Sequence, residues 1–412
     1  LGRAYDFLIC LDKFTVYVQS NCCACLPSMK QKKLLITGLS LNKLADLLIS
    51  AKTTLTALLI SIGAPVWMIG WLVPIRESGA LLPQVLISIY LRKHTQRHLV
   101  WRVGMLTQTL SVFCMLLAVI LFSGGLAGTL ILISLVFLSL GRSACSLTVK
   151  DMEADVATKG ERGNLIGIAS TVSGMVTLVI AIPLAIYDGS LSSNVLLIVL
   201  FGSLLSFVLT LICVWPVKTT VDVGDKEEKA FSIDFDATVY KFILVRGLFV
   251  HSALVAPYFM IEKNGDVKEL LPIYIGAEAT AALLSSIIWG KIADKSAKLT
   301  LQISGVLAII SCIGLLTLQT TTIVTSALLF FLLSVSHAGV RTGRKTYSLD
   351  VKEGHERTEL VGFSNTAIGM ILLAFGALYA ALTPVLTFSV VYIMAGMLLL
   401  AIIITVILPD EK

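Results

Sequence analysis

The sequence predicts an all-α membrane protein whose twelve transmembrane helices form two similar six-helix bundles. The first observation is composition, since 56% of the 412 residues are hydrophobic, 14% are charged and the mean hydropathy is +0.90. Soluble domains carry roughly 25% charged residues. The second is length, because the apolar stretches reach the roughly 20 residues that a helix needs to cross a bilayer. Strands of a membrane barrel would be shorter and would alternate. The third is an internal repeat.

The apolar stretches follow one another in two sets of six. The first set covers 44–62, 66–90, 99–122, 126–149, 163–187 and 193–215. The second covers 237–260, 270–290, 299–319, 322–344, 359–382 and 385–408. Short loops make consecutive helices antiparallel neighbours. We therefore predict an N-terminal leader over 1–42, bundles over 43–216 and 237–408, a polar linker over 217–236 and a tail over 409–412.

The repeat joins residues 150–175 to residues 345–370 when the sequence is shifted by 195 positions, without a gap. The matches include charged residues and glycines, among them Lys150 with Lys345, Asp155 with Asp350, Glu161 with Glu356, Arg162 with Arg357, Gly167 with Gly362 and Gly174 with Gly369. Six spans return the chain to its starting side, so the repeat is parallel, an arrangement typical of transporters. Small residues mark close helix contacts in membranes, so the paired glycines predict surfaces where the halves meet.

Basic residues gather in alternate loops, and this pattern sets the predicted orientation. They precede the first span and lie in the loops after spans 2, 4, 6, 8 and 10, while loop 261–269 is the exception. Positive charge marks the cytoplasmic side, so both termini are predicted to be cytoplasmic. The formal charge of +6 thus reflects topology and predicts no nucleic-acid partner. The sequence has no N-x-[ST] sequon, which agrees with a bacterial inner (plasma) membrane.

The first 28 residues contain no Met, and Met29 stands just before a basic run. We expect Met29 to be the natural start and residues 1–28 to be a start-site artefact. Cys22 and Cys25 form a C-x-x-C pair without a second ligand pair, so we expect no metal there. No P-loop, G-x-G-x-x-G or H-E-x-x-H sequence occurs. The sequence therefore predicts no cofactor, no nucleotide-driven pump and no enzyme.

The loop after span 8 reads Gly290-Lys-Ile-Ala-Asp294-Lys295-Ser-Ala-Lys298. It resembles the G-x-x-x-D-[RK]-x-G-[RK] loop of the major facilitator superfamily, with Ala297 in place of the second glycine. The resemblance covers residues 43–408 and implies a monomeric membrane transporter that works by alternating access. Its close-packing glycine would be Gly290.

The matching loop of the first half departs from the family pattern, with Arg92 where the acid is expected. The resemblance places this loop against the start of span 11. We therefore expect a reversed cytoplasmic gate, in which Arg92 or Lys93 meets Glu356 or Glu359 beside Arg357. Asp294 would cap the start of span 5 near Arg162, flanked by Lys295 and Lys298.

Several ionisable residues lie inside the predicted spans, where each is a functional candidate because charge in a bilayer is costly. They are Lys52, Arg76, Glu77, Arg142, His251, Glu278 and His337, with Arg341 expected to reach the cytoplasmic interface. The resemblance implies that spans 1, 4, 7 and 10 line a central cavity, which would bring Lys52, Arg142, His251 and His337 together.

That set of four is cationic or titratable and favours an anionic or zwitterionic organic solute. Glu77 and Glu278 are the candidates for proton coupling. Arg76 and Glu77 could instead neutralise charge and glue neighbouring spans. The main prediction is a secondary active transporter for a small organic solute. The sequence does not identify the solute. The alternatives are a non-transporting sensor or assembly protein of the same fold and a membrane enzyme acting on lipids.

Overall fold

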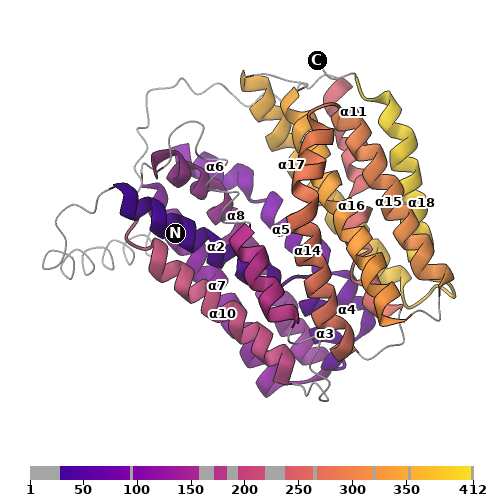
Figure 1. The fold of residues 1–412 in the computed structure, drawn as a ribbon, viewed down its shortest axis with the longest axis horizontal. Coiled ribbons are helices and arrows are strands. Elements are labelled where there is room, and N and C mark those ends of the chain that lie inside the picture. Colours follow the sequence, from indigo (N-terminus) through magenta and orange to yellow (C-terminus); the bar gives the residue numbers. More distant parts are fainter. Residues whose placement is uncertain are drawn as a thin grey trace, which may run out of the picture.

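The computed structural model describes residues 28–92, 96–156, 171–182, 194–218, 237–262, 267–318, 322–350 and 354–409. These residues are mainly helical, and the helices form two bundles side by side (Figure 1). The first bundle runs from indigo to magenta and the second from orange to yellow (Figure 1). Residues 1–27, which belong to the expected start-site artefact 1–28, and residues 219–236 of the predicted linker lie outside the described part of the chain.

The first bundle places a helix at each of the first six predicted spans. Its elements are α2 (Ser28–Leu48), α3 (Thr54–Ser61), α4 (Val66–Gly70), α5 (Leu72–Leu81), α6 (Gln84–Arg92), α7 (Arg97–Leu121), α8 (Gly124–Val156), the helix Thr171–Ile182 and α10 (Asn194–Val214). Helix α8 packs against α7 and α5, and α10 packs against α2.

The second bundle places a helix at each of the last six predicted spans. Its elements are α11 (Ala237–Phe249), α12 (His251–Leu254), α13 (Tyr258–Ile261), α14 (Val267–Ala293), α15 (Ala297–Thr317), α16 (Ile323–Asp350), α17 (Gly354–Leu382), α18 (Val391–Ile404) and the 3₁₀ helix η1 (Thr405–Ile407). Across the described residues, seven helices are long and apolar enough to cross a membrane. The protein is an integral membrane protein, and the part of the chain that the structure describes is mainly helical.

Three spans that the sequence predicts as continuous are broken in the structure. Span 1 is interrupted between Leu48 and Thr54, and span 7 is interrupted at Val250 and again before Tyr258. Span 2 is divided into α4, α5 and α6. Pro83 stands at the joint between α5 and α6 and Pro257 at the joint before α13, where proline has no N–H to continue the helical ladder. Non-helical backbone at membrane depth is tolerated where protein surrounds it. Thr53 and Thr54 at the break in span 1 are fully buried.

The two bundles meet along α5 and α17, and along α14 with α3 and the helix Thr171–Ile182. A Cβ atom added to Gly369 of α17 would come within 2.7 Å of Leu82, and one added to Gly174 would come within 2.7 Å of Leu283. These equivalent contacts confirm, for Gly174 and Gly369, the prediction that the repeated glycines mark where the halves meet. Gly167 lies outside the described residues, and no packing is described around Gly362.

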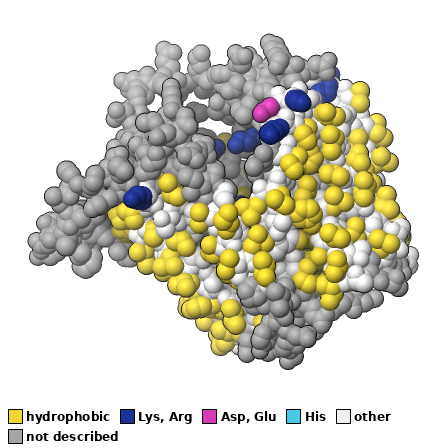
Figure 2. All heavy atoms as spheres, viewed as in Figure 1, with side chains coloured by type: hydrophobic (Ala, Val, Ile, Leu, Met, Phe, Trp, Pro, Cys, Tyr) yellow, Lys and Arg dark blue, Asp and Glu magenta, His cyan; other side chains and the backbone are white. Residues whose placement is uncertain are grey.

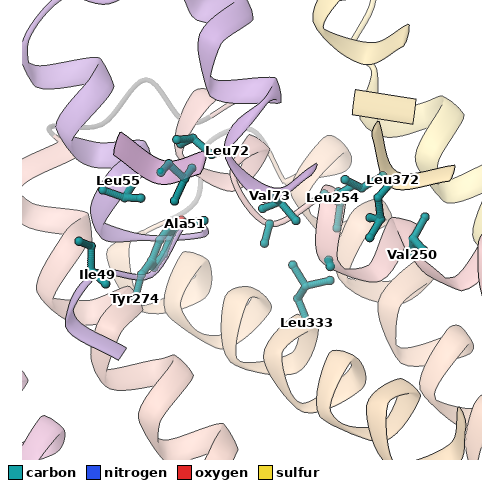
Figure 3. Packing of buried hydrophobic residues seen from close by; sticks show 14 of the residues in the cluster. Ile49, Ala51, Leu55, Leu72, Val73, Val250, Leu254, Tyr274, Leu333 and Leu372 are labelled. Atoms are coloured by element: carbon teal, nitrogen blue, oxygen red, sulfur yellow. The ribbon is translucent and has the colours of Figure 1, made fainter. Parts of the chain in front are cut away.

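The outer surface of the described helices is apolar, as a lipid-facing surface requires. Leu110 is 62% exposed, Ile212 61% and Leu328 62%. Apolar side chains cover much of the visible surface, while Lys and Arg lie mostly near the upper end (Figure 2). Inside, an apolar cluster joins the bundles, with Ile49, Ala51, Leu55, Leu72 and Val73 from the first and Val250, Leu254, Tyr274, Leu333 and Leu372 from the second (Figure 3).

Candidate substrate cavity

A small, partly open cavity of about 20 Å³ lies where the second bundle faces Glu77 of the first. Its walls come from α11, α12, α15, α16 and α17 of the second bundle and from Glu77 of the first. The polar and charged side chains on the wall are Glu77, Arg246, Ser252, His337, Arg341 and Arg344. Val250 and Leu372 on the wall also belong to the apolar cluster of Figure 3, so this cluster borders the cavity.

The break in span 1 is held by Arg76, whose side chain is only 6% exposed. Its guanidinium donates to the backbone carbonyl of Ile49 at 2.7 Å and to that of Asp46 at 3.3 Å. These carbonyls belong to the end of α2, where the helix no longer supplies partners. A cation also suits the negative end of the helix dipole. Arg76 is therefore the group that makes a broken helix tolerable at this depth.

The Asp46 carboxylate links three helices. One oxygen lies 2.9 Å from Arg76 Nη2 of α5, and the other lies 3.5 Å from Arg142 Nη2 of α8. The Arg142 side chain is 34% exposed and that of Asp46 21%, so this second contact is partly solvated. Arg76 and Arg142 share the single carboxylate of Asp46, so these three side chains together carry a net positive charge.

A second polar contact crosses between the bundles at the same break. The Ser50 hydroxyl donates to Glu278 Oε2 of α14 at 3.0 Å, and the backbone N–H of Lys52 donates to the Ser50 oxygen at 3.3 Å. Glu278 is also the carboxylate with the largest favourable electrostatic effect on Lys52. The structure thus brings Lys52 and Glu278, one from each bundle, into electrostatic range of each other.

Helix α16 presents three polar side chains to the cavity, His337, Arg341 and Arg344. Residues spaced by three or four lie on one helix face, so the spacing itself places them together. Arg341 is exposed into the cavity, whereas the sequence predicts that it reaches the cytoplasmic interface. Glu77 lies within electrostatic range of Arg341, Arg344, Lys52 and Arg142, although it forms no hydrogen bond within the described part of the chain.

The hydrogen bonds around His337 fix the position of its proton. The Ser252 hydroxyl donates its hydrogen to the carbonyl of Phe249 at 2.9 Å, so its oxygen accepts from Nδ1–H of His337 at 3.2 Å. The other ring nitrogen, Nε2, then carries a lone pair and accepts from Arg341 Nη2 at 3.2 Å. Neutral His337 therefore connects the backbone of α11 to the Arg341 guanidinium.

Arg246 of α11 is buried and forms a polar link toward the first bundle. Its guanidinium donates to Ser364 Oγ at 2.9 Å and to Asn365 Oδ1 at 2.7 Å. The Asn365 amide then donates to Gln84 Oε1 at 3.2 Å. Among the described residues these partners of Arg246 are neutral, so no carboxylate compensates its charge directly.

His251 lies apart from the charged groups on the cavity wall. It is fully buried, and its ring packs edge-on against Phe375 and Tyr379 of α17, with centroid distances of 4.5 and 5.6 Å. Its Nδ1 lies 2.7 Å from the carbonyl of Leu248. His251 therefore faces the aromatic side chains of α17 and is not among the residues that line the cavity.

Most of the predicted cytoplasmic gate lies beyond what the structure describes. Lys93 and Arg162 are outside the described residues, and no side-chain position is described for Arg92, Glu356, Arg357 or Glu359. Asp294 and Lys295 are exposed in the turn between α14 and α15, and Lys298 Nζ donates to the carbonyl of Leu408 at 2.8 Å. No described atom lies within 4 Å of a Cβ built on Gly290, so the close approach predicted there is not seen.

Sequence reasoning missed Asp46, Arg246 and Arg344. Arg246 lies in the middle of predicted span 7, so the cost of a charge at that depth was a signal that could have found it. Asp46 and Arg344 lie at the edges of predicted spans, where charges are common. Only the contacts with other helices give them significance.

Comparison with known proteins gives the fold. No protein-family model and no curated protein matches the sequence. The nucleoside transporter NupG, in a mutant form, matches with a TM-score of 0.70 and 10% identity over 92% of this chain and 98% of that chain. The chain has the major facilitator fold.

Two further transporters share this fold. A bacterial homologue of the iron transporter ferroportin is 16% identical, and 98% of that chain is covered. Its inward-facing state matches 92% of this chain with a TM-score of 0.65, and its outward-facing state matches 91% with 0.60. A POT family transporter in complex with a thioalcohol-conjugated peptide matches at 0.65 with 12% identity, over 91% of this chain and 94% of that chain. All three of these proteins are transporters.

Proposed function

We propose that this chain is a secondary active transporter, which moves a small organic solute across the membrane as its two bundles alternately expose the cavity to either side. The observation that carries the proposal is a charged cavity between two halves of the major facilitator fold, bordered on one side by an apolar cluster that both halves build. The solute is anionic or zwitterionic, because cations outnumber carboxylates on the cavity wall.

The packing of α4 on α17 offers a direct test. A Cβ on Gly70 would lie 3.4 Å from the Cα of Ala380, a spacing compatible with a disulfide between the two helices. In a background with Cys114 replaced, Gly70→Cys with Ala380→Cys should cross-link under oxidation. The cross-link should stop solute flux in proteoliposomes, and reduction should restore it. Flux that continues through the cross-linked protein would refute alternating access across this interface.

Proton coupling is the second part of the proposal, with Glu77 and Glu278 as the candidate carriers. Both are carboxylates at membrane depth; Glu77 lies in electrostatic range of cations of both bundles, and Glu278 lies in electrostatic range of Lys52 of the first bundle. Dissipating the pH gradient should abolish solute accumulation. Glu77→Gln or Glu278→Gln should abolish accumulation while leaving solute exchange. Accumulation that is indifferent to the gradient would indicate uniport or exchange.

The cellular placement completes the proposal. The loops rich in Lys and Arg face the cytoplasm, the host membrane is a bacterial inner membrane and the transporter works as a monomer. The alternative function is a sensor or assembly protein of the same fold. Binding of a solute without any flux in proteoliposomes would favour that alternative.

A further inference from the structure

We propose that the solute is a small organic dianion held by Arg341 and Arg344 of α16, and that His337 is a positioning residue that aims Arg341 into the cavity. The inference rests on the proposed transport function and deepens it by naming a ligand class and its residues. A phosphate monoester and a short dicarboxylate share the required chemistry, two anionic charges on planar or tetrahedral oxygen groups.

The geometry of α16 is the first argument. Arg341 and Arg344 are three residues apart on one helix face, and both side chains line the cavity. Like charges at this spacing repel each other and destabilise a helix. Arg341 hydrogen-bonds only to neutral His337, and Arg344 forms no hydrogen bond or ion pair with any other described residue. Two guanidinium groups are therefore left with free donors at an accessible wall.

The charge balance is the second argument. The cavity wall carries Arg246, Arg341 and Arg344 against one carboxylate, Glu77, and His337 is neutral by its hydrogen bonds. The wall thus has two positive charges in excess. Cations in a low-dielectric site need compensation, and a ligand with two negative charges supplies it. Guanidinium groups suit this ligand because they bind carboxylates and phosphates through paired hydrogen bonds.

The third argument is the series of hydrogen bonds that positions Arg341. Arg341 has a long, flexible side chain, and ordering it costs conformational entropy. The Phe249 carbonyl holds the Ser252 hydroxyl, Ser252 orients His337, and His337 accepts from Arg341. This series of hydrogen bonds leaves the remaining N–H donors of Arg341 available to a ligand. Preorganisation of this kind strengthens binding by removing the ordering cost from the binding step.

The test is ligand binding to the full-length purified protein, measured by thermal shift and calorimetry. The probes are succinate and glutarate as dicarboxylates and glycerol phosphate as a phosphate monoester, with butyrate as a monoanion of similar size. At least one dianion should raise the melting temperature with concentration, as mass action requires, while butyrate should not. The two arms also separate carboxylate from phosphate recognition. If no dianion binds, or butyrate binds as well as the dianions, the proposal is overturned.

Substitutions on α16 test whether Arg341 and Arg344 form the dianion site. Arg344→Gln and Arg341→Gln should each weaken dianion binding about tenfold or more, since a charge-assisted hydrogen bond is worth roughly 1.5–3 kcal/mol. Lys345→Gln is the matched control, because Lys345 is the next residue on α16, carries the same charge and is exposed. Equal effects of Arg344→Gln and Lys345→Gln would point to general attraction and refute a defined site.

The role of His337 has its own readout. His337→Leu should weaken binding, whereas His337→Gln should retain much of the affinity because its amide oxygen can still accept from Arg341. In an Arg341→Gln background, His337→Leu should have little further effect, because it acts through Arg341. Additive losses in the double variant would show a separate structural role and exclude positioning.

Failure of this inference is distinguishable from failure of transport. Dianion binding that depends on Arg344, without flux in proteoliposomes, would keep the site and refute the transporter. Flux of a neutral or cationic solute that is insensitive to Arg344→Gln would keep the transporter and refute the dianion site.

Discussion

Replacing Arg76 with Met should destabilise the protein far more than replacing Arg142 with Met, although both arginines contact Asp46. Arg76 lies 2.9 Å from the carboxylate, also donates to the carbonyls of Ile49 and Asp46, and is 6% exposed. Removing one partner of a buried pair costs about 3–5 kcal/mol. Arg142 still faces Asp46 at 3.5 Å in that variant, so we expect the lower end, about 3 kcal/mol.

The Arg142 contact is longer and its side chain is 34% exposed, so water can replace it. Pairs of this kind are worth about 1 kcal/mol or less. Equilibrium unfolding of the purified variants in mixed detergent and SDS measures both free energies. In the Arg76→Met background, Asp46→Asn should recover part of the loss by removing a carboxylate that has lost its main partner. An Arg142→Met variant that is as unstable as Arg76→Met would refute the reasoning.

Two further predictions concern contacts between the bundles. A Cβ on Gly376 would collide with Pro74, so Gly376→Val should lower the melting temperature and weaken packing of α17 on α5. Gly396→Val is the control and should change the melting temperature little, because no described atom lies within 4 Å of a Cβ built there. Equal shifts for both variants would contradict this prediction. Gln84→Ala should cost about 1–2 kcal/mol by removing two neutral hydrogen bonds, one accepted from the Asn365 amide and one donated to the carbonyl of Ala80. Asn365→Ala should cost more in the same unfolding assay because it also removes a partner of Arg246, and the reverse order would show that the link does not bear on stability.

Part of the candidate site follows from sequence. Glu77 and His337 stand out as charged or titratable residues inside apolar spans, and both line the cavity. His251 has the same sequence signal yet packs against aromatic rings of α17. Depth in a span is a local property that hydropathy reports, but the surroundings of a side chain depend on which neighbouring helices it faces.

The membrane class, the two similar halves and the contacts of Gly174 and Gly369 between them were predictable from the sequence. These features depend on apolar length, on a repeat and on side-chain size, which are readable along one chain. Three features appear only in the tertiary structure. Span 1 is broken where Arg76 binds its free carbonyls, Asp46 contacts arginines of two other helices, and two arginines of α16 line the cavity. A buried charge is stable only with particular partners, and those partners come from helices far apart in the sequence.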